Sequence, residues 1–241
     1  MKKYYFSYRF IFFIILLTNQ WACHTNEKTM TGQSTIQKYS YLALGDSYTI
    51  GESVPTKENF PHQVCHLLQN EGIPFENPRI IAKTGWTTDE LNAAIEKADA
   101  NEPIATNYDI VTLLIGVNNQ YRGRTVENYA PEFENLLKKA IAFAGGKTKN
   151  VIVISIPDWS VTPFAKDRNP SQIAKAIDAY NAMNLKISKT YNITYINITN
   201  LTREAATDKS LLTTDGLHPS GKDYLRWAQK IAAAIKKNLQ K

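Results

Sequence analysis

Short apolar runs alternate with longer segments of helical periodicity along most of the chain. The runs are rich in β-branched side chains, which is typical of strands. They are Tyr41–Leu44, Arg79–Ala82, Asp109–Ile115, Val151–Ile156 and Ile193–Ile198. The segments with apolar side chains every three to four positions predict helices at residues 60–70, 88–98, 126–144, 170–189 and 220–239.

Five alternations of strand and helix predict a single α/β domain over residues 39–241, built as a three-layer α/β/α sandwich around a mainly parallel five-stranded sheet. The third and fourth runs are apolar at nearly every position, as strands covered on both faces require. In such sheets ligands bind beyond the carboxyl ends of the strands. We therefore look for the chemistry in the loops that follow the strands.

The first 38 residues do not share this pattern. Residues 1–22 carry a basic start and the apolar run Phe10–Leu17, which predicts a secretory signal peptide. The run is too short to span a bilayer, which needs about 20 apolar residues. Cys23 follows it and resembles the lipidated cysteine of bacterial lipoproteins, although Gln20 stands where Leu is usual. Ordinary signal cleavage and a plain buried thiol are the alternatives, and polar residues 23–38 would form a tether.

Composition and charge narrow the classes of function. The chain of 241 residues is 43% hydrophobic and has two cysteines, so it can form a sizeable core and cannot be a disulfide scaffold. Its net charge is +6, but Lys2, Lys3 and Arg9 supply half of that excess. No basic run remains, so we expect no nucleic-acid partner. The predicted location is exported, either anchored to a bacterial membrane through Cys23 or periplasmic.

Ser47 directly follows the first predicted strand, in the sequence Gly45-Asp46-Ser47. A serine placed there lies at the carboxyl edge of a parallel sheet, where its hydroxyl and its backbone N–H can face a ligand. The alternative is that Asp46 and Ser47 only cap a turn.

Asp215 and His218 stand three residues apart, just before the last predicted helix. A histidine that acts as general base needs a partner on its second ring nitrogen, and an aspartate at this spacing can fold back to provide it. The alternative is that Asp215-Gly216 is an ordinary turn and that Pro219 begins the helix.

Two further loops after strands offer hydrogen-bond donors for an oxyanion. Gly85 allows close approach of the backbone, and Asn118 carries a side-chain amide. Taken separately, glycine and asparagine are common turn residues, so each loop alone is a weak signal.

In order, Gly45-Asp46-Ser47, Gly85, Gly116-x-Asn118 and Asp215-x-x-His218 resemble the four sequence blocks of the SGNH, or GDSL, hydrolases. The resemblance runs from Tyr41 to about Leu239. It implies a flavodoxin-like sheet and hydrolysis of esters or thioesters. It also implies roles: Ser47 as nucleophile, His218 as base and Asp215 as its orienting partner, with the oxyanion hole formed by Ser47 N–H, Gly85 N–H and the Asn118 amide. Asn119 departs from the family, which usually has Asp there, and this puts the hydrogen bonds that support Asn118 in question.

The resemblance implies an enzyme that needs no metal and no other cofactor. Its substrate would be a small-molecule, glycan or lipid ester: a carbohydrate O-acetyl ester, a lysophospholipid or another short-chain acyl ester. Trp159, Phe164 and Tyr121 follow predicted strands and can line such a pocket, although Trp159 and Phe164 can equally cover the core. His62 and His66 have the spacing of metal ligands on a helix, but packing or surface roles are favoured. The alternative function is a non-catalytic surface lipoprotein that binds glycan or lipid. A monomer is favoured.

Overall fold

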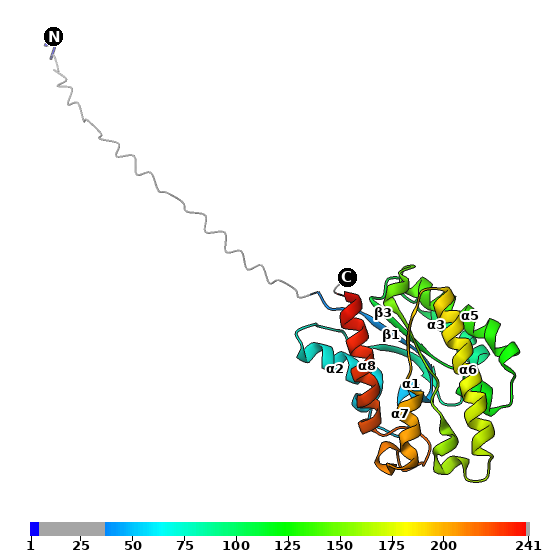
Figure 1. The fold of residues 1–241 in the computed structure, drawn as a ribbon. Coiled ribbons are helices and arrows are strands. Elements are labelled where there is room, and N and C mark those ends of the chain that lie inside the picture. The colour runs from blue at the N-terminus through cyan, green and yellow to red at the C-terminus, as the bar shows by residue number, and fades with distance from the viewer. Residues whose placement is uncertain (5–36, 240–241) are drawn as a thin grey trace. The chain divides into compact units, whose positions relative to one another are not determined.

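A five-stranded parallel sheet forms the centre of the domain (Figure 1). The computed structural model describes residues 1–4 and 37–239 of the chain. Its strands are β1 (Tyr41–Asp46), β2 (Arg79–Lys83), β3 (Ile110–Leu114), β4 (Val151–Ile154) and β5 (Thr194–Ile196). They lie side by side in the order β2-β1-β3-β4-β5. This is the flavodoxin-like order, so the predicted fold class is confirmed.

The burial of the strands follows their place in the sheet. Every residue of β1, β3 and β4 is buried, whereas most residues of the edge strands β2 and β5 are only partly buried. Leu44 pairs with Leu113 on one side and with Ile81 on the other. The continuous apolar runs of the sequence thus belong to strands that are covered on both faces.

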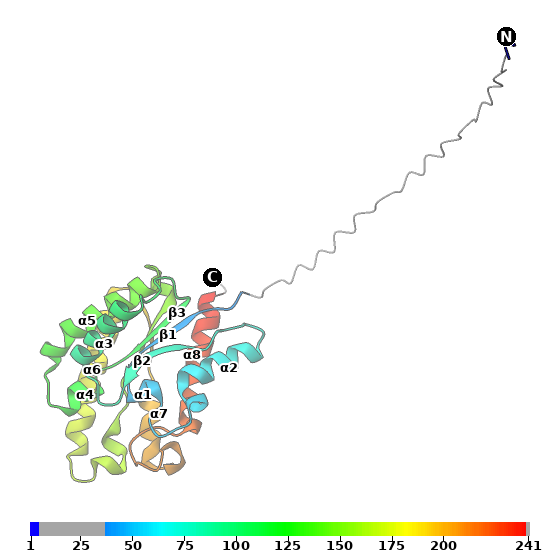
Figure 2. The ribbon, with the colours of Figure 1, turned by 180° about the vertical axis from the view of Figure 1, so that it is seen from behind.

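Five long helices complete the layers. They are α2 (Phe60–Asn70), α3 (Thr88–Asn101), α5 (Val126–Phe143), α6 (Pro170–Thr190) and α8 (Gly221–Leu239). Both ribbon views show α2 and α8 packed together on one face of the sheet, with α3, α5 and α6 on the other (Figures 1 and 2). This is the three-layer sandwich that the sequence predicts.

The starts of three long helices have a local cause. The side chains of Asn59, Thr125 and Asn169 each accept a hydrogen bond from a backbone N–H in the first turn of α2, α5 and α6. A cap of this kind satisfies a donor that has no partner inside the helix. Pro170 adds a preset backbone angle at the first position of α6.

Several short elements have no counterpart in the sequence prediction. Three are α-helical: α1 (Ser47–Ile50), α4 (Val117–Tyr121) and α7 (Thr199–Arg203). The others are 3₁₀ turns: η1 (Thr56–Glu58), η2 (Thr148–Asn150), η3 (Trp159–Val161), η4 (Pro163–Ala165), η5 (Glu204–Ala206) and η6 (Lys209–Leu211). Helices of one turn are too short to show a periodic pattern. Two of them, α1 and α4, carry residues of the candidate site.

The predictions for the N-terminal part of the chain concern residues that the structure does not describe. All but the first four residues of the predicted signal peptide (1–22), the predicted lipidation site at Cys23 and most of the tether at residues 23–38 fall on positions 5–36. They therefore stay predictions. Cys65, in α2, is a buried free thiol.

None of the helices within residues 1–4 and 37–239 has the length and apolar character that crossing a membrane requires.

Candidate active site

The candidate site lies where the order of the strands reverses. β1 is followed in the chain by β2 on one side of it, whereas β3, β4 and β5 extend the sheet on the other. The segments that leave the carboxyl ends of β1 and β3 therefore diverge and open a crevice. Ser47 begins α1 after β1, and Asn118 lies in α4 after β3. Both therefore reach the same crevice from neighbouring strands.

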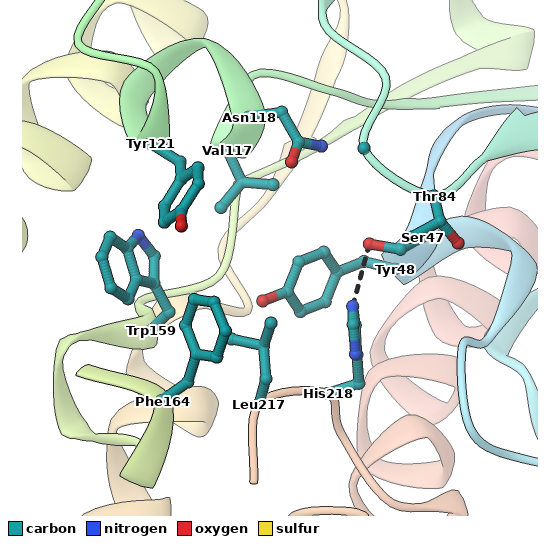
Figure 3. A pocket seen from close by; sticks show the side chains of 11 residues that line it. Ser47, Tyr48, Thr84, Val117, Asn118, Tyr121, Trp159, Phe164, Leu217 and His218 are labelled. Carbon is teal, nitrogen blue, oxygen red and sulfur yellow. Dashed lines mark hydrogen bonds between the residues drawn. The ribbon is translucent and has the colours of Figure 1, made fainter. Parts of the chain in front are cut away.

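Ser47, His218 and Asp215 form one hydrogen-bonded chain. The Ser47 hydroxyl lies 2.9 Å from His218 Nε2, although the two residues are 171 positions apart in the sequence (Figure 3). The other ring nitrogen, Nδ1, lies 2.7 Å from Asp215 Oδ2. A carboxylate on Nδ1 makes that nitrogen the donor and leaves Nε2 free to accept the serine proton. Ser47 and His218 are 4% and 6% exposed, so the pair is largely shielded from water.

The Asp215 carboxylate is held by a dense set of donors. Its Oδ1 accepts hydrogen bonds from the Thr213 hydroxyl at 2.7 Å, from Leu217 N–H at 2.8 Å and from His218 N–H at 2.9 Å. Its Oδ2 accepts from the Ser53 hydroxyl at 2.8 Å in addition to the imidazole. Partial burial raises the pKa of Asp215, but the hydrogen bonds outweigh that effect and hold the pKa well below its usual range. The carboxylate is therefore ionised throughout the neutral range.

The other aspartate of the site is in a different environment. Asp46 is fully buried, and its side chain accepts the Tyr48 N–H at 3.0 Å, which caps α1. Burial raises its pKa from 3.8 to about 7, against the effect of that hydrogen bond. Asp46 thus caps the first turn of α1, which is the alternative that the sequence left open. The side chain of the next residue, Ser47, nevertheless reaches the imidazole of His218.

Gly45 is required by the close approach of other chain segments. A Cβ on Gly45 would lie 2.5 Å from the carbonyl oxygen of Leu114 in β3 and closer still to the Thr49 hydroxyl in α1. The backbone of β1 therefore has room for no side chain at the point where α1 folds over the sheet. This places Ser47 immediately at the sheet edge.

Three donors border the same cavity as the Ser47 hydroxyl. Ser47, Gly85 and Asn118 all line it. Ser47 N–H is at the first position of α1, where no acceptor exists inside the helix. Within residues 37–239 no hydrogen bond uses the Gly85 N–H. The Asn118 amide donates one of its two N–H bonds to the Trp86 carbonyl at 2.9 Å, which leaves the second for a ligand.

Asn119 has its own buried network. Its Oδ1 accepts the Thr88 N–H at 3.1 Å, and its Nδ2 donates to the Thr88 hydroxyl at 2.6 Å. That hydroxyl in turn donates to Glu132 on α5. Both polar atoms of the amide at position 119 are therefore hydrogen-bonded, and the carboxylate of this network stands on α5. The Asn118 side chain is held separately, by its bond to the Trp86 carbonyl.

The rest of the cavity is mainly apolar. It measures about 110 Å³ and is lined by Ser47, Tyr48, Thr84, Gly85, Val117, Asn118, Tyr121, Trp159, Phe164, Leu217 and His218. The rings of Tyr121, Trp159 and Phe164 lie with centroids 5.5–6.0 Å apart. Figure 3 shows them together on the side of the cavity away from Ser47. We call these three residues the aromatic wall.

The sequence left open whether Trp159 and Phe164 line a pocket or cover the core, and the aromatic wall shows both roles. Trp159 is 4% exposed and belongs to the core, yet it also lines the cavity. Phe164 and Tyr121 are 47% and 41% exposed and stand at the cavity mouth. Arg168 lies over the Tyr121 ring, 5.2 Å from its centroid.

Sequence reasoning missed several polar contacts. Ser53 and Thr213 donate to Asp215, and Arg122 Nη2 donates to the Gly85 carbonyl at 2.7 Å, which holds the loop that carries Gly85. Thr213 is close enough to Asp215 in sequence to have been considered. Ser53 acts across 162 positions and belongs to no motif, so no local signal marks it. Arg122 stands just past Asn119 and invites attention as a pocket residue, but its bond to Gly85 spans 37 positions and could not be read from the sequence.

The two histidines of α2 are hydrogen-bonded to amides. His62 Nδ1 lies 2.8 Å from Asn59 Oδ1, and His66 Nε2 lies 3.1 Å from Asn70 Nδ2. Within the described part of the chain, no group of three or more His, Cys, Asp or Glu side chains is arranged to hold a metal ion.

Comparison with known proteins identifies related chains. The model of the GDSL-like Lipase/Acylhydrolase family matches residues 43–225. No curated protein sequence matches the chain. Among solved structures, the psychrotrophic esterase EstA from Pseudoalteromonas superposes with a TM-score of 0.61 at 17% identity, over 85% of this chain and 100% of its own.

Two further solved structures give similar values. The lipase/acylhydrolase from Enterococcus faecalis has a TM-score of 0.62 at 19% identity, over 83% of this chain and 96% of its own. A variant of Axe2, an acetyl-xylooligosaccharide esterase from Geobacillus, has a TM-score of 0.58 at 19% identity, over 83% and 96%. At such identities these likenesses show a shared fold.

Proposed function

Since the chain belongs to the GDSL-like lipase/acylhydrolase family and is a carboxylic ester hydrolase, we propose that it cleaves short-chain acyl esters through an acyl-enzyme on Ser47. The observation that carries this proposal is the hydrogen-bonded chain from the Ser47 hydroxyl through His218 to Asp215. A serine hydroxyl is a weak nucleophile unless an adjacent base removes its proton. Here the imidazole of His218 is hydrogen-bonded to the Ser47 hydroxyl, and the Asp215 carboxylate is hydrogen-bonded to the imidazole.

Acylation begins with transfer of the Ser47 proton to His218 Nε2 as Oγ attacks the ester carbonyl carbon. The imidazole then carries a positive charge, which Asp215 Oδ2 stabilises through Nδ1–H. The tetrahedral intermediate collapses when its bond to the alkoxy oxygen breaks. The proton on Nε2 passes to that oxygen, and the alcohol leaves.

Deacylation follows the same route with water as nucleophile. His218 takes a proton from water, whose oxygen attacks the acyl carbon, and the Ser47 oxygen leaves with the proton that Nε2 holds. In both steps the carbonyl oxygen becomes an anion. Ser47 N–H, Gly85 N–H and the second N–H of Asn118 border the cavity and would donate to it.

The size of the cavity supports a short acyl chain. A protein cavity of about 150 Å³ accommodates benzene, so the 110 Å³ beside Ser47 corresponds to an acyl group of about four carbon atoms. The aromatic wall stands opposite Ser47 and would limit longer chains. One structural neighbour is an acetyl-xylooligosaccharide esterase, and an acetyl group fits this space. Acetylated carbohydrate is therefore the preferred class, ahead of lysophospholipid.

A panel of p-nitrophenyl esters from acetate to palmitate, with acetylated xylan and lysophospholipid, tests reaction and substrate together. We expect the highest kcat/KM at two to about four acyl carbons and no turnover by Ser47→Ala. Phe164→Ala, which shortens an exposed member of the aromatic wall, should extend the range to longer chains with little loss of stability.

A fluorophosphonate probe provides the second measurement. The Pseudoalteromonas neighbour was solved inhibited by monoethylphosphonate, which supports this choice of reagent. We expect labelling of the wild-type protein at Ser47 and none of Ser47→Ala. A folded wild-type protein that is neither labelled nor active would contradict the proposal and favour the non-catalytic role of binding glycan or lipid.

We also propose that the enzyme is exported and held at a bacterial membrane by a lipid on Cys23. The basic start, the apolar run Phe10–Leu17 and the cysteine that follows support this. Detergent phase partitioning of the protein from its native host tests it. The wild-type protein should enter the detergent phase and Cys23→Ala the aqueous phase; equal partitioning of both would refute the lipid anchor.

A further inference from the structure

Ser53 has an uncommon backbone conformation next to the catalytic chain. It lies in the loop between α1 and η1 with a φ of +65°. Among the described residues, Ser53 and Asn192 are the only ones other than glycine with positive φ. This region is unfavourable for residues with a Cβ, and such strain persists where the surrounding structure holds the residue in place. Gly51, two positions earlier, also has a positive φ, of +77°, but it has no Cβ that would make this conformation unfavourable.

The side chain of Ser53 has a specific partner. Its hydroxyl donates to Asp215 Oδ2 at 2.8 Å, across 162 positions of sequence. Oδ2 is the oxygen that lies 2.7 Å from His218 Nδ1, whereas the three other donors to this carboxylate all bind Oδ1. Ser53 is thus the one described residue besides His218 that contacts the oxygen facing the imidazole.

The loop that carries Ser53 is also tied to the nucleophile. The N–H groups of Gly51 and Glu52 donate to the Ser47 carbonyl at 3.1 and 3.0 Å. Ser53 therefore connects the segment that holds Ser47 with the segment that holds Asp215 and His218. A hydroxyl in this position does two things: it fixes the plane of the carboxylate relative to the ring, and it takes up part of the negative charge on Oδ2.

We propose that Ser53 is a positioning residue of the active site, which acts through Asp215 to set the orientation and the basicity of the His218 imidazole. This inference rests on the proposed function of Ser47 and His218. It explains why a serine occupies a position whose backbone favours glycine.

Ser53→Gly separates the hydroxyl from the backbone. The variant removes the hydrogen bond to Oδ2 and also the strain of a positive φ; these effects oppose each other, so its Tm should stay close to that of the wild-type protein. With more charge left on Oδ2, the imidazolium is stabilised. We expect the midpoint of the acid limb of the kcat/KM profile to shift to higher pH by roughly half a pH unit. On the plateau, kcat should fall about threefold to tenfold, with KM unchanged.

Asn192→Gly is the matched control. Asn192 has a φ of +54° and lies between α6 and β5, at the opposite end of the sheet from the site. Asn192→Gly relieves a positive φ, as Ser53→Gly does, but it removes no contact with Asp215. Its kinetic parameters and pH profile should equal those of the wild-type protein.

Ser53→Thr provides the reciprocal variant. It keeps a hydroxyl but adds a β-branch, which is poorly tolerated at positive φ. We expect a lower Tm than in the wild-type protein, with a pH profile close to the wild-type one. Ser53→Gly should therefore change the kinetics without lowering the stability, and Ser53→Thr should lower the stability without changing the kinetics, a separation that a purely structural role of Ser53 would not produce.

NMR titration of the His218 ring tests the inference without turnover. Two titratable groups lie against this ring: Asp215, from the same loop, and Tyr48 in α1, whose ring centroid lies 5.0 Å away; both are unchanged in the variants. We expect the midpoint of the titration to rise in Ser53→Gly. If the midpoint and the plateau kcat both stay at wild-type values, the role of Ser53 is refuted while the esterase stands. If the wild-type protein is inactive and unlabelled, the proposed function fails, and the titration still decides whether Ser53 acts on His218.

Discussion

Two aspartates near Ser47 respond to opposite influences. Asp215 accepts five hydrogen bonds, which hold its pKa low despite partial burial. Asp46 accepts few and is fully buried, which raises its pKa to about 7. Hydrogen bonds to the ionised form and removal from water act on a carboxylate in opposite directions. Asp215 can therefore serve as a permanent negative charge, whereas Asp46 holds its proton up to neutral pH.

The raised pKa of Asp46 has a consequence for stability. Between about pH 4 and pH 7 the unfolded chain loses this proton and the folded protein keeps it, so the free energy of unfolding falls as pH rises through that window. Asp46→Asn keeps an oxygen for the Tyr48 N–H and removes the ionisation. We expect the variant to be more stable than wild type at pH 8, with the difference vanishing near pH 4.

Urea unfolding at the two pH values measures this difference. Asp167→Asn, on the surface, serves as the control and should show no gain that depends on pH. Equal stability of Asp46→Asn and wild type at pH 8 would contradict the effect of burial on this group.

Asn118 provides the second prediction at the level of a single residue. Loss of one oxyanion donor typically lowers turnover by about 10²–10³. We expect Asn118→Ala to lose kcat in that range with KM little changed, because the donor acts on the charge that develops during the reaction. The variant should remain folded, as circular dichroism and Tm would show. Asn135→Ala, on the exposed surface of α5, is the control. A loss of less than tenfold would mean that Asn118 is not an oxyanion donor.

Individual residues of the site differ in how far the sequence reveals them. Ser47, Gly85 and Asn118 each follow a strand, and the structure brings them to one cavity together with His218. Their placement could be predicted because parallel strands end at the same edge. Ser53 could not be predicted. Its partner is 162 positions away, and a positive φ in a serine leaves no mark in the sequence.

At the scale of elements, three helices meet at one partly buried hydrogen-bond network. Asn119 in α4 exchanges two hydrogen bonds with Thr88 at the start of α3, and the Thr88 hydroxyl donates to Glu132 in α5. Since a hydroxyl has one proton, it can donate to only one carboxylate. The amide at position 119 and the carboxylate at position 132 are therefore a matched pair.

Asn119→Asp tests this pairing. At neutral pH the variant places a second carboxylate on the Thr88 hydroxyl and removes the donor from Nδ2 in a fully buried position. We expect a loss of about 1–3 kcal/mol in the free energy of unfolding, and partial recovery in the double variant with Glu132→Gln, whose amide can donate. The four proteins form a double-mutant cycle. Independent, additive effects of the two substitutions would show that the positions are not coupled.

The elements themselves were largely predictable. The five long helices begin or end within a few residues of the predicted positions, because caps such as Asn59 and Thr125 stand in the sequence beside a periodic segment. The short helices α1 and α4 were not predictable, because segments of four and five residues are too short to show a helical period of apolar positions. Both form where a strand ends against the crevice, and tertiary contacts such as that between Gly45 and Leu114 determine their course.

At the scale of the whole molecule, the proposed reaction requires a neutral imidazole and an ionised carboxylate at the same time. The low pKa of Asp215 keeps the carboxylate ionised well below neutrality. The loss of activity in acid therefore does not come from Asp215, and we attribute it to protonation of the proposed histidine base, since histidine ordinarily titrates near 6.5. We expect kcat/KM toward a short p-nitrophenyl ester to fall on the acid side of neutrality. A rate that stays constant down to pH 4, in a protein shown to be folded there, would rule out a histidine base.

The separation of Ser47 and His218 along the chain also matters during synthesis. A ribosome makes Ser47 and the loops that carry Gly85 and Asn118 first, and adds Asp215 and His218 only after the fifth strand of the sheet. A nascent or prematurely terminated polypeptide that stops before residue 215 has a serine without a proton acceptor. Under the proposed mechanism, ester cleavage therefore requires translation at least as far as residue 218.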